Sequence, residues 1–131
     1  MSQPSFKLYD AQREQVEKSK STYYYIMKMG TGKTVVGLSH AKKWFPDKDV
    51  IVAAPRQVVN AMSWQKDAKL VGFKNNLQVI TTDGVKKLDN IDVQNKLLIV
   101  DEAHKFKNKS ARSKKLNELL KASAGFVFLS G

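Results

Sequence analysis

The chain has no cysteine, and only two of its 131 residues are histidine. Without cysteine there is no disulfide framework and no thiolate-ligated zinc site, and such a composition is typical of a reducing compartment. Two histidines also argue against a structural metal centre of another kind. The first residues lack the apolar core of a signal peptide, and no apolar run approaches the ~18 residues that a membrane helix needs. We therefore expect a soluble, cytoplasmic protein with no membrane partner.

Acidic residues are scarce as well. The chain has 12 Asp and Glu against 23 Lys and Arg, which gives a formal net charge of +11 and an isoelectric point near 9.9. A surface this basic attracts polyanions, and it binds nucleic acid through phosphate neutralisation that is independent of sequence and sensitive to salt. An excess of lysine also keeps a small domain soluble, so composition alone leaves both interpretations open.

A glycine turn between an expected strand and an expected helix is the most informative motif. Its residues are Gly30, Thr31, Gly32, Lys33 and Thr34. Glycines let successive backbone N–H groups point at a phosphate, and a helix that starts here adds its positive dipole end. Lys33 would reach the β- and γ-phosphates, and the Thr34 hydroxyl would bind Mg²⁺. The motif predicts a triphosphate site, with an ordinary glycine turn and an exposed lysine as the alternative.

Two acids follow a wholly apolar run at residues 97–100. The run stops at Asp101 and Glu102, and His104 stands two residues further on. Carboxylates in this position are costly unless they hold a cation or move a proton. Asp101 is suited to hold Mg²⁺, and Glu102 to deprotonate the water that attacks the γ-phosphate, with Lys33 stabilising the transition state. His104 is expected to couple the nucleotide to the rest of the chain. Alone, Asp101-Glu-Ala-His104 is a helix-cap sequence.

Apolar runs alternate with helical patterns along the chain. Strands are expected at 23–27, 50–53, 77–80, 97–100 and 126–129, and helices at 10–18, 33–45, 56–70 and about 110–121, with a short helix or turn at 83–88. This alternation predicts an α/β fold with a mostly parallel sheet and helices on both faces. Ligands bind beyond the carboxyl ends of such strands, so the glycine turn and Asp101 can meet at one site.

With both motifs in hand, the chain resembles the first RecA-like lobe of superfamily 2 helicases, and most of all the Swi/Snf-type, DEAH-box DNA translocases. The most specific match is Asp101-Glu-Ala-His-Lys-Phe-Lys-Asn108, followed by Ser110. Met29-Gly-Thr-Gly-Lys-Thr34 matches the family's phosphate loop, although Met27-Lys28 replaces the usual acidic pair. The resemblance covers nearly the whole chain. It implies a three-layer RecA-like P-loop NTPase domain that binds ATP with Mg²⁺.

The resemblance also implies roles for residues outside these two motifs. Leu8-Tyr-Asp-Ala-Gln12 matches the Q motif, in which Gln12 would read the adenine edge, although a glutamine on a helix surface gives the same sequence. Leu129-Ser-Gly131 matches the start of motif III, in which Ser130 would couple the nucleotide to the rest of the chain.

Two further matches concern nucleic acid. Pro55, Trp64 and Asp67 resemble motif Ia with a slightly longer spacing, which makes Arg56 a candidate contact to the phosphate backbone. Thr81-Thr82 resembles motif Ib, with Thr82 as a second backbone contact, although threonines at strand ends are commonly just β-formers.

The resemblance also implies which part of a complete two-lobe ATPase this chain would form. Residues 1–131 would form a single N-terminal lobe that ends at motif III, without the second RecA-like lobe that supplies motifs IV to VI and an arginine. Without such an arginine, hydrolysis loses roughly 10³- to 10⁵-fold, so the chain alone would be weak or inactive.

Two functions remain open. One is the ATP-binding lobe of a DNA-dependent ATPase that moves on double-stranded DNA, completed by a second lobe in cis or in trans. The other is a stand-alone ATP- or DNA-binding protein without efficient turnover, regulatory or interfering in its effect. A small P-loop kinase is disfavoured by the motif order and the lack of an arginine-rich lid. The choice of duplex over single-stranded DNA or RNA rests on the resemblance alone.

Overall fold

The structure of the chain is a computed structural model, which describes residues 23–26, 32–102 and 111–130. The expected helix at 10–18 lies outside these ranges, and so do the predicted site residues Gln12, Gly30, Thr31 and His104. Within the described ranges, no helix combines the length and the apolar composition that crossing a bilayer requires.

Five parallel strands form one sheet in the order β1-β5-β4-β2-β3. The strands are β1 (Tyr23–Ile26), β2 (Val50–Ala54), β3 (Leu77–Thr81), β4 (Leu97–Asp101) and β5 (Gly125–Ser130). All four neighbouring pairs are parallel, so every strand ends at the same edge, which we call the carboxyl edge. The predicted parallel sheet is confirmed, and each expected strand lies within two residues of its predicted bounds.

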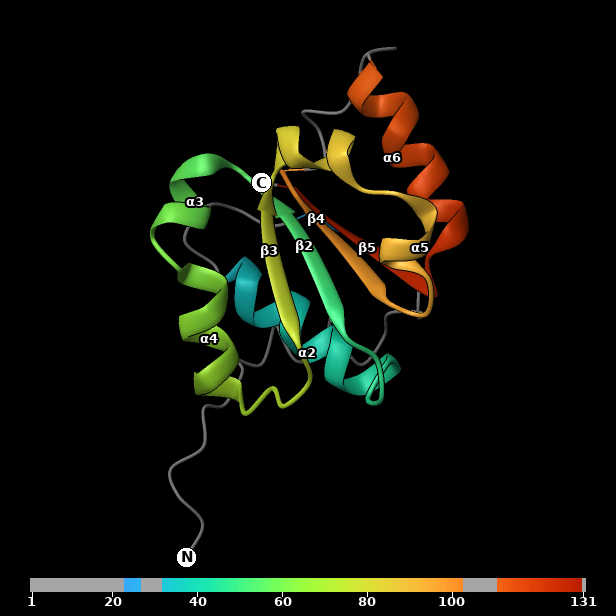
Figure 1. Ribbon diagram of the computed structural model, residues 1–131. Helices are drawn as coiled ribbons and strands as arrows, with labels where there is room; N and C mark the ends of the chain where they lie inside the picture. Colours follow the sequence, from blue (N-terminus) through green and yellow to red (C-terminus); the bar gives the residue numbers. More distant parts are fainter. Residues whose placement is uncertain (1–22, 27–31, 103–110, 131) are drawn as a thin grey trace, which may run out of the picture.

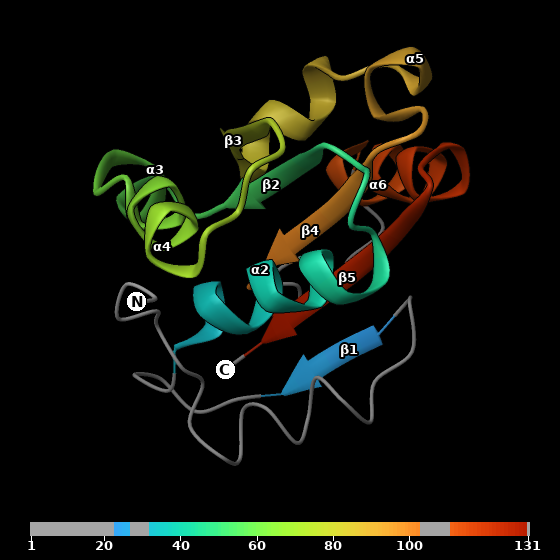
Figure 2. The same ribbon diagram turned by 90° about the horizontal axis from the view of Figure 1, so that it is seen from below.

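Helices cover both faces of the sheet, which gives three layers (Figures 1 and 2). One face packs against α2 (Lys33–Trp44) and α4 (Ser63–Val71), with the short α3 (Arg56–Asn60) beside α4. The other face packs against the 3₁₀ helix η1 (Thr82–Lys87), α5 (Asn90–Val93) and α6 (Ala111–Ala122). The three-layer α/β arrangement predicted from the sequence is the one observed.

The two hydrophobic cores explain why the central strands are continuous apolar runs. All five residues of β2 and of β4 are buried, because these strands lie inside the sheet with a helical layer on each side. Alternate residues therefore belong to opposite cores: Val52 packs with α2 and α4, whereas Ile51 packs with α5 and α6. A strand buried on both faces has no polar side to alternate with, as in other parallel sheets.

The segment at 56–70, expected to be one helix, forms two. Between α3 and α4, Met62 has a φ of 59°, in the left-handed region. A residue in this conformation cannot continue a right-handed helix, so the chain turns before α4 begins at Ser63. Gly72 follows α4 and ends it with a φ of 72°, which glycine adopts without strain. Sequence pattern alone also missed α5, which begins with a capping box between Asp89 and Asp92.

Candidate functional site

Lys33 meets the two acids at the carboxyl edge of the sheet. Its Nζ atom donates a hydrogen bond to Oε2 of Glu102 at 2.5 Å and lies 3.6 Å from Oδ1 of Asp101. Lys33 is the first residue of α2, Asp101 is the last residue of β4, and Glu102 follows directly. The parallel topology places these two chain segments together, as the sequence predicts for the glycine turn and the acidic pair.

The backbone of Glu102 adopts an uncommon conformation. Its φ of 56° lies in the left-handed region, which costs roughly 1–2 kcal/mol for a residue with a side chain. Outliers of this kind persist where the surroundings hold them and are concentrated at functional sites. Here the turn directs the Glu102 carboxylate toward Lys33, which is 69 residues away in the sequence.

Asp101 has a buried carboxyl group, and one of its two oxygen atoms lacks a hydrogen-bond donor among the described residues. The residue is 3% exposed, and among the described residues its Oδ1 atom has no hydrogen-bond donor. Burial raises the pKa of Asp101 above its ordinary value of 3.8, and the charge of Glu102 raises it further. Lys33 and the backbone N–H of Glu102 act in the opposite direction but do not cancel the effect of burial. A further cation beside Oδ1, in addition to Lys33, would favour the charged form of Asp101 and lower its pKa.

The start of α2 is suited to bind an anion. Gly32, which precedes the helix, has a φ of 77°, a conformation that glycine adopts without strain. Among the described side chains, none caps this helix end, and the first turn has no acidic residue. The first N–H groups of a helix lack partners within it and carry a positive partial charge. Phosphate oxygens are suitable acceptors for them.

Thr34 lies next to Lys33 and contacts a different helix. Its hydroxyl donates a hydrogen bond to Oδ2 of Asp67 on α4. The motif Ia match includes Asp67 but gives it no partner, so the sequence did not predict this contact. The only sequence signal is the spacing of Asp67 three residues after the buried Trp64, which places both on one face of α4.

The donor set is compatible with Mg²⁺. This ion binds oxygen ligands and usually takes one or two carboxylates together with substrate phosphates and water. Asp101 offers a buried carboxylate oxygen without a hydrogen-bond donor among the described residues, and Thr34 offers a hydroxyl oxygen. Within the described ranges, His, Cys, Asp and Glu side chains form no group of three or more that could hold a metal by themselves. The residues therefore fit an ion that arrives with a nucleotide.

The remaining predicted residues also follow strands at the carboxyl edge. Arg56 is the exposed first residue of α3, one position after the Pro55 that follows β2. Thr82 begins η1 directly after β3, where the hydroxyl of the preceding Thr81 accepts a hydrogen bond from the Gly84 N–H at 3.1 Å. Ser130 is the last residue of β5 and pairs with Ile26.

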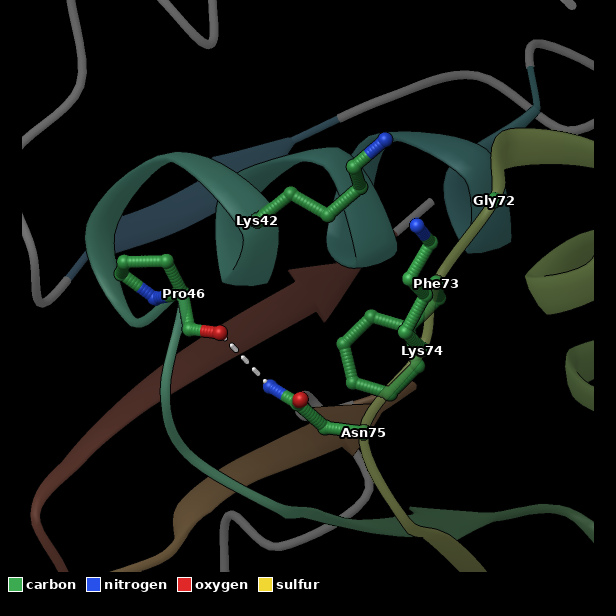
Figure 3. Close-up of a pocket in the computed structure, with 6 residues that line it drawn as sticks. All are labelled: Lys42, Pro46, Gly72, Phe73, Lys74 and Asn75. Atoms are coloured by element: carbon green, nitrogen blue, oxygen red, sulfur yellow. Dashed lines mark hydrogen bonds between the residues drawn. The ribbon is translucent and has the colours of Figure 1, made fainter.

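A pocket of about 300 Å³ lies at the opposite edge of the sheet, before β2 and β3 begin (Figure 3). Two of its polar side chains bond to backbone carbonyls: the Asn75 amide donates to Pro46 and Lys48 at 2.8 and 2.9 Å, and Lys42 donates to Val71 at 2.7 Å. The Asn75 bonds hold together the loops before β2 and β3, and the Lys42 bond joins α2 to the end of α4. We therefore interpret this pocket as a structural junction and place the candidate site at the carboxyl edge.

Comparisons with known proteins identify the fold. No family model matches the chain, and no curated protein matches its sequence. Among solved structures, the UvsW helicase from bacteriophage T4 aligns with a TM-score of 0.71 at 12% identity, over 96% of this chain and 53% of that one. The SWI2/SNF2 ATPase core of Sulfolobus solfataricus, solved in complex with dsDNA, aligns with a TM-score of 0.72 at 20% identity, over 99% of this chain and 34% of that one.

A third similar structure is the N-terminal domain of the DNA packaging ATPase from bacteriophage phi29. It has a TM-score of 0.54 at 13% identity and covers 94% of this chain and 78% of that one. The chain thus spans about half of the helicase and a third of the SWI2/SNF2 core, at 53% and 34%. At these identities the likeness concerns the fold, and the chain has the RecA-like α/β fold of the lobes in these helicase and ATPase cores.

Proposed function

We propose that the chain is the ATP-binding lobe of a DNA-dependent ATPase, a helicase-like translocase of the Swi/Snf type that couples ATP hydrolysis to movement on double-stranded DNA. The observation that carries this proposal is the meeting of Lys33 with Asp101 and Glu102 beside the uncapped start of α2. An anion site, a mobile cation and two acids in one place are the parts that phosphoryl transfer to water requires.

Each residue of the cluster has a role in this proposal. The N–H groups at the start of α2 bind phosphate oxygens, and Lys33 leaves Glu102 to contact the β- and γ-phosphates. Thr34 and Asp101 would hold Mg²⁺, which supplies charge neutralisation and orientation of the phosphates. Glu102, once separated from Lys33, orients the attacking water and accepts its proton.

Other roles are proposed on the resemblance to superfamily 2 lobes. Gly30 and Thr31 complete the phosphate loop, and Gln12 reads the adenine. His104 and Ser130 couple the nucleotide to the rest of the chain. A second RecA-like lobe, in cis or in trans, completes the ATP site. Arg56 and Thr82 contact the nucleic-acid backbone.

Two observations support DNA as the partner. The formal net charge of +11 favours a polyanion, and one structure with the same fold was solved with dsDNA. The stand-alone binding protein differs from the translocase lobe in turnover. ATP hydrolysis that duplex DNA stimulates supports the translocase lobe. Bound ATP with no turnover, whether DNA and a second lobe are present or not, supports the binding protein.

The nucleotide site is tested by replacing its cation. Lys33→Ala removes a charge-assisted contact to phosphate, and such contacts contribute about 1.5–3 kcal/mol, or roughly tenfold to hundredfold in affinity. The measurement is the dissociation constant of a fluorescent ATP analogue. Lys74→Ala is the matched control, because it removes the same charge from an exposed position at the opposite edge of the sheet. Equal affinity in the wild type and Lys33→Ala would contradict the assignment.

A further inference from the structure

The hydrogen bond between Thr34 and Asp67 joins the candidate magnesium site to a helix that the phosphate loop does not include. Thr34 is the second residue of α2, whereas Asp67 lies in the middle of α4 and is only partly exposed. The hydroxyl is the donor and the carboxylate is the acceptor. Thr34 therefore has a fixed partner for its one proton.

The direction of this hydrogen bond matters for metal binding. A hydroxyl group has one proton to donate and two lone pairs to offer, and a metal ion binds a lone pair. When the proton is directed at a carboxylate, the lone pairs are directed elsewhere and the side chain loses its rotational freedom. Partners of this kind orient metal ligands, and their removal typically costs about 10–100-fold in metal affinity.

We propose that Asp67 is a positioning residue that orients the Thr34 hydroxyl for Mg²⁺ in the nucleotide complex. The proposal rests on the proposed function, because it needs Mg²⁺ to arrive with ATP at Thr34. Asp67 acts through Thr34, while Asp101 supplies the carboxylate oxygen that lacks a described donor. The two acids therefore have different roles: Asp101 would hold the ion, whereas Asp67 orients the Thr34 hydroxyl toward it.

Packing between the two helices keeps Asp67 in place. Gly37, one turn after Thr34 on the same face of α2, lies against the ring of Trp64, one turn before Asp67 on the same face of α4. A Cβ atom at Gly37 would stand 2.9 Å from a carbon of the Trp64 ring, so the absence of a side chain permits this approach. Further along, Lys42 Nζ donates to the Val71 carbonyl at 2.7 Å. Asp67 thus approaches Thr34 from a helix fixed by two other contacts.

The test measures how much Mg²⁺ contributes to nucleotide binding. The affinity of a fluorescent ATP analogue is determined with Mg²⁺ and with EDTA, for the wild type and for Asp67→Ala, Asp67→Asn, Thr34→Val and the double variant Thr34→Val with Asp67→Ala. We expect Asp67→Ala to reduce the gain that Mg²⁺ gives by about tenfold or more and to leave the affinity in EDTA unchanged. Asp67→Asn should retain most of the gain, since the amide oxygen still accepts the hydroxyl proton.

The double variant provides a second, independent criterion. If Asp67 acts through Thr34, adding Asp67→Ala to Thr34→Val should cause no further loss, because residues that share one interaction are not additive. Far-ultraviolet circular dichroism and thermal unfolding establish that each variant is folded. If Asp67→Ala does not fold, Asp67→Asn and Thr34→Val still test whether the gain from Mg²⁺ depends on the Thr34 hydroxyl.

Several outcomes would overturn the proposal. If Asp67→Ala loses nucleotide affinity equally with Mg²⁺ and with EDTA, Asp67 has a structural role. If Asp67→Ala increases the gain in affinity that Mg²⁺ gives, Asp67 keeps the Thr34 hydroxyl away from the ion. A loss in Asp67→Asn as large as in Asp67→Ala would show that the carboxylate binds the ion itself. In each case the wild type still binds the nucleotide with Mg²⁺, and the proposed function survives. A wild type that does not bind the nucleotide would overturn both.

Discussion

At the scale of single residues, Asp101 shows a conflict between stability and the proposed chemistry. Its carboxyl group lies at the buried end of β4, where burial raises its pKa. The native state then holds the proton more tightly than the unfolded chain does. Stability is therefore lost as the pH rises from near the ordinary value of 3.8 through the raised pKa, and the cost is complete above it.

Asp101→Asn should stabilise the nucleotide-free protein at neutral pH. The amide carries no charge to bury, so its free energy of unfolding should exceed that of the wild type at pH 7. The difference should shrink as the pH is lowered through the raised pKa of Asp101 toward the ordinary value of 3.8, because the wild-type carboxyl group takes up its proton over this range. Urea unfolding across this range in EDTA measures it, with the exposed Asp47→Asn as the control. A difference that stays constant with pH would contradict the explanation.

Single residues also show what the sequence could and could not reveal. Lys33, Asp101 and Glu102 were predictable as neighbours, because the parallel sheet brings a helix start and a strand end to one edge. The partner of Thr34 was not predictable from spacing, because it depends on how α4 crosses α2. The left-handed backbone of Glu102 was also hidden, since nothing in a glutamate predicts a positive φ.

At the scale of secondary structure, the break between α3 and α4 has an energetic consequence. Met62 is 49% exposed and has a φ of 59°. Its N–H donates to the Val59 carbonyl and its carbonyl accepts from Lys66, so the turn is held by backbone bonds. A glycine at this position could keep these bonds without the steric cost of a side chain.

Met62→Gly should raise the free energy of unfolding by about 1 kcal/mol, because the cost of the left-handed conformation is removed. Chemical denaturation of the nucleotide-free chain measures this change. Asn95→Gly is the matched control: Asn95 is also exposed, with a φ of 62°, but asparagine tolerates this region better and should gain less. A destabilised Met62→Gly would mean that the half-exposed side chain packs more effectively than its exposure indicates.

Strands were easier to predict than helices for a physical reason. The central strands β2 and β4, which helices cover on both faces, begin as runs of apolar residues that stand out from the other patterns in the chain. The helical segments have weaker signals. No glycine or proline marks the break between α3 and α4, which lies at Met62. Helix α5 has only four residues, too few to show a helical pattern, and it begins with the capping box of Asp89 and Asp92.

At the scale of the whole molecule, the parallel topology gathers the proposed functional residues at one edge. Each strand ends there, and the residues that follow β2, β3 and β4 include Arg56, Thr82 and Glu102. The proposed nucleic-acid contacts therefore share the edge with the proposed nucleotide site.

DNA binding should be strongly salt-dependent and should involve the carboxyl edge. Three phosphate contacts would give a slope of about −2.7 in log affinity against log salt, or roughly a 40-fold loss between 50 and 200 mM. Fluorescence anisotropy with a labelled duplex measures the slope. We expect Arg56→Ala to reduce it by about 0.9 and Lys74→Ala, at the opposite edge, to leave it unchanged. A flat salt dependence would favour lysines that serve solubility alone.

The junction pocket before β2 and β3 has a practical consequence. Because the natural sequence contains no cysteine, Lys74→Cys would introduce a unique thiol at an exposed position on that rim. A fluorophore attached there would report the tumbling of this domain, which should slow if the proposed second lobe binds. This position lies at the edge opposite the proposed nucleotide site, so the fluorophore signal and nucleotide hydrolysis could be followed together in one preparation.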